Sequence, residues 1–178
     1  MKSVLISIRP QWCEKIVIGK KTIEVRKTAP KEVPFKCYIY MTQGAYKDLG
    51  LYSEGIYQNR MKVIGEFICD KVYLIKNQGN RFVVANEEEG VTNEIARQSC
   101  LDYYDMVNYL GNKDGYGWHI ADLKIYNKPK ELSEFLKPCP AKKGVCLDCM
   151  AYNEYDEVCA NNLTRPPQSW QYVEELEK

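Results

Sequence analysis

The sequence has little of several features that would place a protein in a special class. No apolar run among its 178 residues approaches the roughly 18 residues that a membrane-spanning helix needs. The first residues hold one lysine and a short strand-like run instead of a secretory signal, so we expect a cytoplasmic location. His119 is the only histidine. A catalytic histidine pair is thereby excluded, and we expect His119 to be a hydrogen-bonded structural residue.

The chain also has almost no net charge, at +1, which excludes a uniformly basic surface. The charge is nevertheless uneven, because residues 1–36 hold nine Lys and Arg against three Glu. A local basic surface of this kind attracts phosphate groups even on a nearly neutral chain. The alternative is an ordinary solvated face. With 45% hydrophobic and 28% charged residues, the composition is that of a soluble globular protein.

Residues 19–26 place a lysine, a glutamate and an arginine at the start of a predicted strand. Residues 4–8 before them resemble a strand, and residues 10–18 a short helix. Gly19 stands where that helix would stop, since glycine adopts a positive φ without a steric penalty. Alternation along the strand puts two sets of side chains on opposite faces. Ile23 and Val25 share the buried face, and the other face holds Thr22, Glu24 and Arg26.

The spacing Gly-x-Lys-x-x-Glu-x-Arg resembles the signature of the ASCH domain, a branch of the PUA-like β-barrels. Residues 63–67 and 115–120 resemble further landmarks of that family, in the expected order. The resemblance covers roughly residues 3–126. It implies an α+β fold in which a small PUA-like β-barrel flanked by helices occupies residues 1–128. A Cys-rich C-terminal extension, residues 129–178, would pack on the barrel.

The resemblance also implies a function, because some ASCH proteins bind RNA. We expect a basic cleft that holds RNA or a modified nucleotide through Arg9, Lys20, Lys21, Glu24 and Arg26. Tyrosines around a long loop, residues 42–60, would stack on bases, and they are Tyr38, Tyr40, Tyr46, Tyr52 and Tyr57. The alternative for the charged residues is a structural ion-pair network.

Other ASCH proteins are hydrolases, either amidohydrolases that deacylate modified cytidine nucleosides or ribonucleases. If this chain is an enzyme, the resemblance makes Lys21 and Glu24 the catalytic residues. Glu24 departs from the family, which has a hydroxyl residue there, and it is expected to keep Lys21 protonated. A third catalytic residue stays open among Glu66, Glu87, Glu88, Glu89 and Glu94.

The cysteines fall into two groups. Four are scattered among apolar neighbours and are predicted to be buried small hydrophobic residues, namely Cys13, Cys37, Cys69 and Cys100. The other four crowd together as Cys139, Cys146, Cys149 and Cys159 and include one Cys-x-x-Cys pair. Four thiolates suit tetrahedral zinc, so we predict a structural zinc site in the extension. The third hypothesis for function is therefore a zinc-stabilised interaction module.

The remaining pattern predicts strands over residues 35–41, 61–75, 79–84 and 116–126. Two helices are expected between them, the first capped by Thr92 or Asn93 and the second by Ser99, with Gly111 at the end. Residues 165–173 are expected to be extended, because prolines interrupt any helix there.

Overall fold

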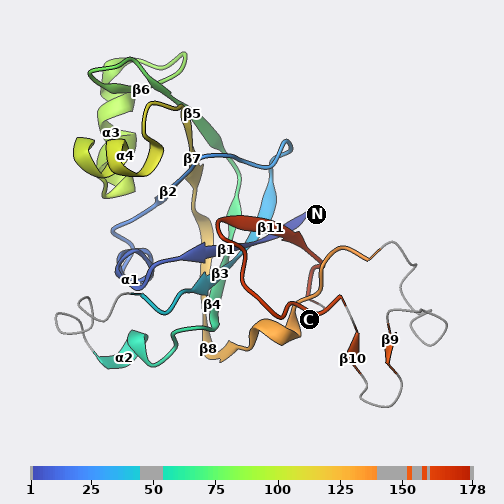
Figure 1. Ribbon diagram of the computed structural model, residues 1–178. Coiled ribbons are helices and arrows are strands. Elements are labelled where there is room, and N and C mark those ends of the chain that lie inside the picture. The colour runs from blue at the N-terminus through green and yellow to red at the C-terminus, as the bar shows by residue number, and fades with distance from the viewer. Residues whose placement is uncertain (1, 45–53, 140–151, 154–157, 160, 177–178) are drawn as a thin grey trace.

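Figure 1 shows the computed structural model, which describes residues 2–44, 54–139, 152–153, 158–159 and 161–176. The described chain is α+β, as predicted, with its strands in two main sheets and a small hairpin. The hairpin joins β9 (Tyr152–Asn153) to β10 (Val158–Cys159). None of the helices in the described ranges is long and apolar enough to cross a membrane.

The larger sheet has five strands, and its order along the sheet is β11 (Trp170–Val173), β1 (Ser3–Ile8), β3 (Phe35–Met41), β4 (Val63–Cys69) and β8 (Ala121–Lys130). Only β1 and β3 pair in parallel; the other neighbours are antiparallel. A parallel pair needs a crossover. That crossover carries α1 (Pro10–Val17) and β2 (Ile23–Arg26), the two elements on either side of the charged motif.

The smaller sheet is antiparallel and runs in the order β2, β7 (Gly115–His119), β5 (Val72–Asn77) and β6 (Phe82–Val84). Helices α3 (Glu89–Ser99) and α4 (Tyr103–Leu110) lie at the end of this sheet (Figure 1). They bury one apolar cluster with it, which includes Ile23, Val25, Ile95, Met106 and Leu110. Two further short helices lie in the part of the chain that the structure describes, α2 (Glu54–Tyr57) and a 3₁₀ turn (Leu132–Glu134).

The α+β fold predicted from the sequence is confirmed, but the described strands do not close into a barrel and form two separate main sheets instead. The predicted strand 116–126 shows why. It breaks at Ile120, so that β7 joins the smaller sheet while β8 joins the larger one. Trp118 and Ile120 still enter the same buried cluster, which fills the space beside β1, β3 and β4.

Several predicted elements are confirmed and others are shifted. The helix before the motif ends as expected, with Gly19 at φ 73°. The run 61–75 forms two strands, and Gly65 in the first packs against the backbone carbonyl of Lys124. The predicted helix caps are wrong. Helix α3 begins at Glu89, ahead of Thr92 and Asn93, and α4 is capped by Asp102 instead of Ser99.

The end of the described chain is an edge strand of the larger sheet. Strand β11 pairs with β1, and Ser7 contacts the same segment through its hydroxyl, which donates to the Pro167 carbonyl at 2.7 Å. The Trp170 ring meets the buried Trp118 ring edge-on at 5.7 Å, and its indole N–H donates to the Thr28 hydroxyl. The extended prediction for residues 165–173 is confirmed over Trp170–Val173, whereas the preceding residues contain bends and carry Gln168 to the site described next.

Candidate functional site

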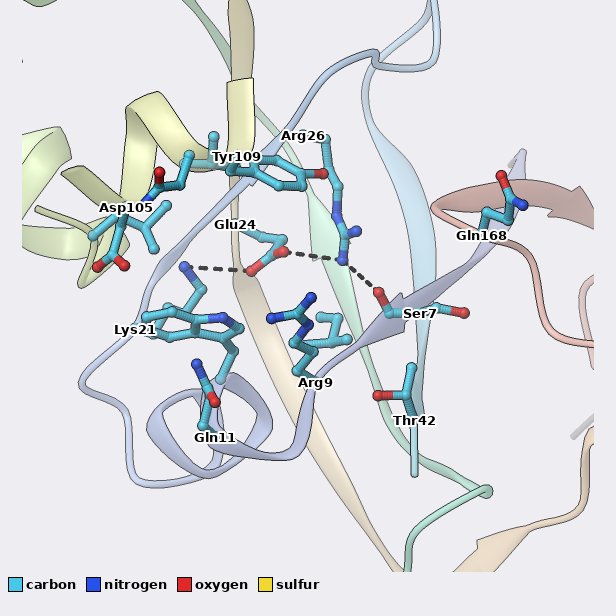
Figure 2. Close-up of a pocket in the computed structure, with 15 residues that line it drawn as sticks. Ser7, Arg9, Gln11, Lys21, Glu24, Arg26, Thr42, Asp105, Tyr109 and Gln168 are labelled. Carbon is cyan, nitrogen blue, oxygen red and sulfur yellow. Dashed lines mark hydrogen bonds and ion pairs between the residues drawn. The ribbon is translucent and has the colours of Figure 1, made fainter. Parts of the chain in front are cut away.

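The charged motif between α1 and β2 is buried, whereas lysine, glutamate and arginine are mostly exposed in folded proteins. Lys21 is 2%, Glu24 5% and Arg26 6% exposed. The apolar face of β2, with Ile23 and Val25, packs under α3 and α4 as expected. The opposite face is also covered, because the β1–α1 segment lies over it (Figure 2). Both faces of this strand are therefore shielded from bulk water.

The three charged side chains form one connected row (Figure 2). The Lys21 Nζ lies 3.4 Å from Glu24 Oε2, and Arg26 Nη2 lies 3.0 Å from Glu24 Oε1. The row is anchored at both ends by backbone carbonyls. Lys21 Nζ donates to Ser99 O at 2.5 Å, and Arg26 Nη2 donates to Ser7 O at 2.7 Å. Because Ser99 ends α3, the lysine ammonium sits at the negative end of that helix.

Burial changes the acid–base character of Lys21. Loss of solvent lowers its pKa below the ordinary 10.5, and the nearby Glu24 carboxylate only partly opposes this. Glu24 favours the protonated lysine, as the sequence suggested, but burial outweighs it in setting the direction of the pKa shift.

Two buried polar atoms of the row have no hydrogen-bond partner among the described residues. They are Glu24 Oε2, which has only its 3.4 Å contact with the Lys21 ammonium, and Arg26 Nε. Buried polar atoms in folded proteins nearly always have a hydrogen bond. Unpaired atoms beside a cavity therefore indicate a place where a ligand can supply the missing partner.

A cavity of about 490 Å³ lies against this row. Two aromatic side chains line it, Trp12 from α1 and Tyr109 from α4, and the Lys21 Nζ lies 5.2 Å from the centre of the Trp12 ring. The remaining lining residues are Ser7, Ile8, Arg9, Gln11, Lys21, Glu24, Val25, Arg26, Thr42, Leu101, Asp105, Asn108 and Gln168. The cavity thus combines aromatic walls with cations, carboxylates and neutral amides.

The structure brings four of the five predicted binding residues together at this cavity: Arg9, Lys21, Glu24 and Arg26. Arg9 is exposed at the start of α1 and extends toward the row (Figure 2), with no ion pair in the described part of the chain. Lys20 is exposed and does not line the cavity.

The tyrosines expected to stack on bases do not line the cavity where the structure describes them. Tyr38 and Tyr40 belong to a separate apolar cluster with Phe135, and Tyr57 is buried. Tyr46 and Tyr52 lie outside the described residues. The sequence reasoning missed Trp12 and Tyr109, although the spacing of Asp105, Asn108 and Tyr109 places them on one side of a predicted helix.

None of the five glutamates considered for a third catalytic role lines the cavity. Glu66 accepts a hydrogen bond from Tyr126. Glu87 and Glu94 form salt bridges away from the cavity, with Lys71 and Arg97 respectively. Glu88 and Glu89 lie at the start of α3. The second carboxylate at the cavity is Asp105, which the sequence analysis did not single out.

The remaining predicted residues have mixed outcomes. Cys13, Cys37 and Cys69 are fully buried, as expected, and burial raises the pKa of each thiol. Cys100 is half-buried and caps α3 with φ 55°. His119 Nδ1 shares a hydrogen bond with Asp70 at 2.6 Å, as expected of a structural histidine.

The zinc site stays a prediction. Cys146 and Cys149 lie outside the described residues. Cys139 is a free, half-buried thiol, and Cys159 belongs to β10. Within the described residues no group of three or more potential metal ligands occurs.

The described chain thus combines one mixed and one antiparallel sheet in an α+β arrangement, with a crossover through α1 and β2 that carries the buried Lys-Glu-Arg row. This is the fold of solved ASCH domain structures. The chain is similar to the crystal structure of ASCH from Zymomonas mobilis, with a TM-score of 0.56 and 17% identity over 98% of this chain and 89% of that one. No family model and no curated protein matches the sequence.

Two mutant structures of the Zymomonas mobilis protein are similar to this chain as well. A tyrosine-to-phenylalanine mutant gives a TM-score of 0.56 at 16% identity, covering 98% of this chain and 92% of that one. A serine-to-alanine mutant gives 0.57 at 16% identity, covering 98% and 89%. At such low identity the likeness establishes the shared fold, and the function has to be argued from the site.

Proposed function

We propose that this chain binds RNA or a modified nucleotide by holding one base in the cavity between α1, β2 and α4. The cavity volume of about 490 Å³ lies within the roughly 300–1,000 Å³ of small-molecule sites. Trp12 and Tyr109 supply aromatic faces, on which unpaired bases stack in many RNA-binding proteins.

The observation that carries the proposal is the buried row with its unpaired atoms. Glu24 Oε2 needs a donor and Arg26 Nε needs an acceptor. The edge of a nucleobase offers both kinds of group within a few ångströms. A ligand of this chemistry would complete hydrogen bonds that the described protein leaves open, so recognition would depend mainly on the base.

Phosphate plays a smaller part in this proposal than the sequence suggested. Lys21 and Arg26 already share the Glu24 carboxylate, and Lys20 lies outside the cavity. Arg9 is the exposed cation without an ion pair among the described lining residues. We therefore expect about one phosphate contact, and a log–log salt slope of about −0.7 for single-stranded RNA.

The experiment is a titration of nucleoside monophosphates and short single-stranded RNA at two salt concentrations. Arg9→Ala should weaken binding and flatten the salt slope, because it removes the phosphate contact. Lys20→Ala is the matched control. It should change neither the affinity nor the salt slope, since Lys20 does not line the cavity. Tyr109→Ala should weaken all ligands, since stacking contributes about 1–3 kcal/mol per base. Absence of binding at low salt, or equal effects of both basic variants, would overturn the proposal.

A hydrolase in the same cavity is the second candidate, and one observation favours it. Burial lowers the pKa of Lys21, so more of this lysine is the neutral amine, which can take up a proton, than for an exposed lysine at the same pH. Glu24 still stands where the amidohydrolases have a hydroxyl residue. The test is release of acetate from an acetylated cytidine, with RNA cleavage followed in parallel. Product formed by the wild type and lost in Lys21→Met would establish the hydrolase, and absence of product would leave binding as the function.

A further inference from the structure

A row of three aromatic rings lies on the surface beside the cavity. Tyr104 is 74% and Tyr103 42% exposed, and their ring centres are 5.8 Å apart. The half-buried Phe82 continues the row, 5.9 Å from Tyr103. Single exposed aromatic residues are common on protein surfaces. Adjacent exposed aromatic rings are less common, and they often mark a surface that binds a ligand or another macromolecule.

The row is continuous with the cavity through helix α4. Asp105, Asn108 and Tyr109 line the cavity from this helix, and Figure 2 shows Asp105 and Tyr109 beside Lys21 and Glu24. Tyr104 precedes Asn108 by four residues, so the two side chains are neighbours on the helix surface. A chain-like ligand that leaves the cavity past Asn108 therefore meets Tyr104 next.

We propose that this aromatic row binds the bases that neighbour the one in the cavity, so that the ligand is single-stranded RNA and not a free nucleotide. This inference rests on the proposed function. Tyrosine rings accept any base by stacking, which needs no sequence-specific hydrogen bond. The Tyr104 side chain makes no hydrogen bond to the described residues, and its ring meets the Tyr103 ring edge-on.

The charges around the row are mixed, which makes stacking the main contribution. Lys76 and Arg81 line a hollow next to Phe82, but Glu87 and Glu89 line it too. Phosphate attraction at this end is therefore largely cancelled. Loss of a ring should lower affinity equally at all salt concentrations, whereas loss of a phosphate contact would change the salt slope.

The experiment compares a nucleoside monophosphate with a trinucleotide of the same base. Wild-type protein should bind the trinucleotide about 5- to 150-fold more tightly, the gain expected from stacking one further base. Tyr104→Ala should remove most of this gain, leave the monophosphate affinity unchanged and leave the salt slope unchanged. Tyr104→Trp should keep the higher affinity for the trinucleotide, because the larger indole ring can still stack on a base. Tyr172→Ala is the matched control, since Tyr172 is also exposed, at 36%, but lies on β11.

The outcomes separate this inference from the proposed function. If neither ligand binds, the proposed function fails and the inference fails with it. If the monophosphate binds but the trinucleotide shows no gain, or Tyr104→Ala and Tyr172→Ala behave alike, the inference alone is wrong. If Tyr104→Ala instead abolishes self-association of the protein without changing RNA binding, the row is a protein contact and the inference is again wrong.

Discussion

Replacing Lys21 by methionine tests whether the buried row stabilises the fold as well as forming the site. Methionine keeps the length of the apolar stem, so the change removes the ammonium without opening a large cavity. Glu24 loses one of its two cations, and Ser99 O loses the donor that lies 2.5 Å away. Breaking a buried ion pair by removing one partner costs about 3–5 kcal/mol. Since Arg26 stays 3.0 Å from Glu24, we expect the lower end, about 3 kcal/mol.

The assay is denaturant unfolding of wild type and Lys21→Met at several pH values. The folded-state pKa of Lys21 lies below the 10.5 of the unfolded chain. Between these two values the unfolded state binds more protons, so the wild type should gain stability relative to Lys21→Met as pH rises. Groups common to both proteins cancel in this difference. Lys20→Met, at an exposed position, is the control and should change stability little.

Equal stability of Lys21→Met and wild type at all pH values would refute this reasoning, because an ammonium that contributes nothing is not part of a buried network. Replacing an exposed lysine would be expected to change the unfolding free energy little. The burial of Lys21 reverses that expectation.

Three further predictions concern other parts of the chain. Gly65→Ala should lower the unfolding free energy by about 3 kcal/mol, measured by denaturation, since a Cβ would clash with the Lys124 carbonyl oxygen. Asp102→Ala should cost about 1 kcal/mol in the same assay, because Asp102 and Asp105 form the capping box of α4; an unchanged midpoint would contradict the cap. Elemental analysis of untagged protein should find about one zinc per chain at the cysteines of residues 139–159, and fully folded metal-free protein would refute that site.

The sequence predicted local features well where a single residue determines the backbone conformation. Gly19 ends α1 with a positive φ because few other residues tolerate that conformation. The alternation along β2 correctly placed Ile23 and Val25 in the apolar cluster with α3 and α4, although Val25 also lines the cavity beside Glu24. The alternation of side chains along β2 does not show, however, whether the polar face of the strand is covered by another part of the chain. The residue that anchors Lys21 is Ser99, which lies 78 positions away in the sequence.

The aromatic walls of the cavity were missed for a related reason. Trp12 and Tyr109 come from different helices and meet the motif only in the folded chain. The predicted cap of α4 was wrong because two overlapping capping patterns occur around residue 102. Ser99-x-x-Asp102 and Asp102-x-x-Asp105 both match a capping pattern at the start of α4. In the structure Ser99 is still the last residue of α3, which Cys100 ends with its positive φ, so Asp102 becomes the cap of α4.

The central claim, that a base binds in the cavity lined by Trp12 and the buried row, is tested most directly by the indole N–H signals in a nuclear magnetic resonance titration with each of the four nucleoside monophosphates. The chain has three tryptophans, so single Trp→Phe variants assign all three signals. We predict that the Trp12 signal shifts saturably with at least one nucleotide, because its ring lines the cavity. The Trp170 signal should stay in place, since this ring packs outside the cavity against Trp118. Shifts confined to Trp170, or no shift of Trp12 at saturating nucleotide, would contradict the claim.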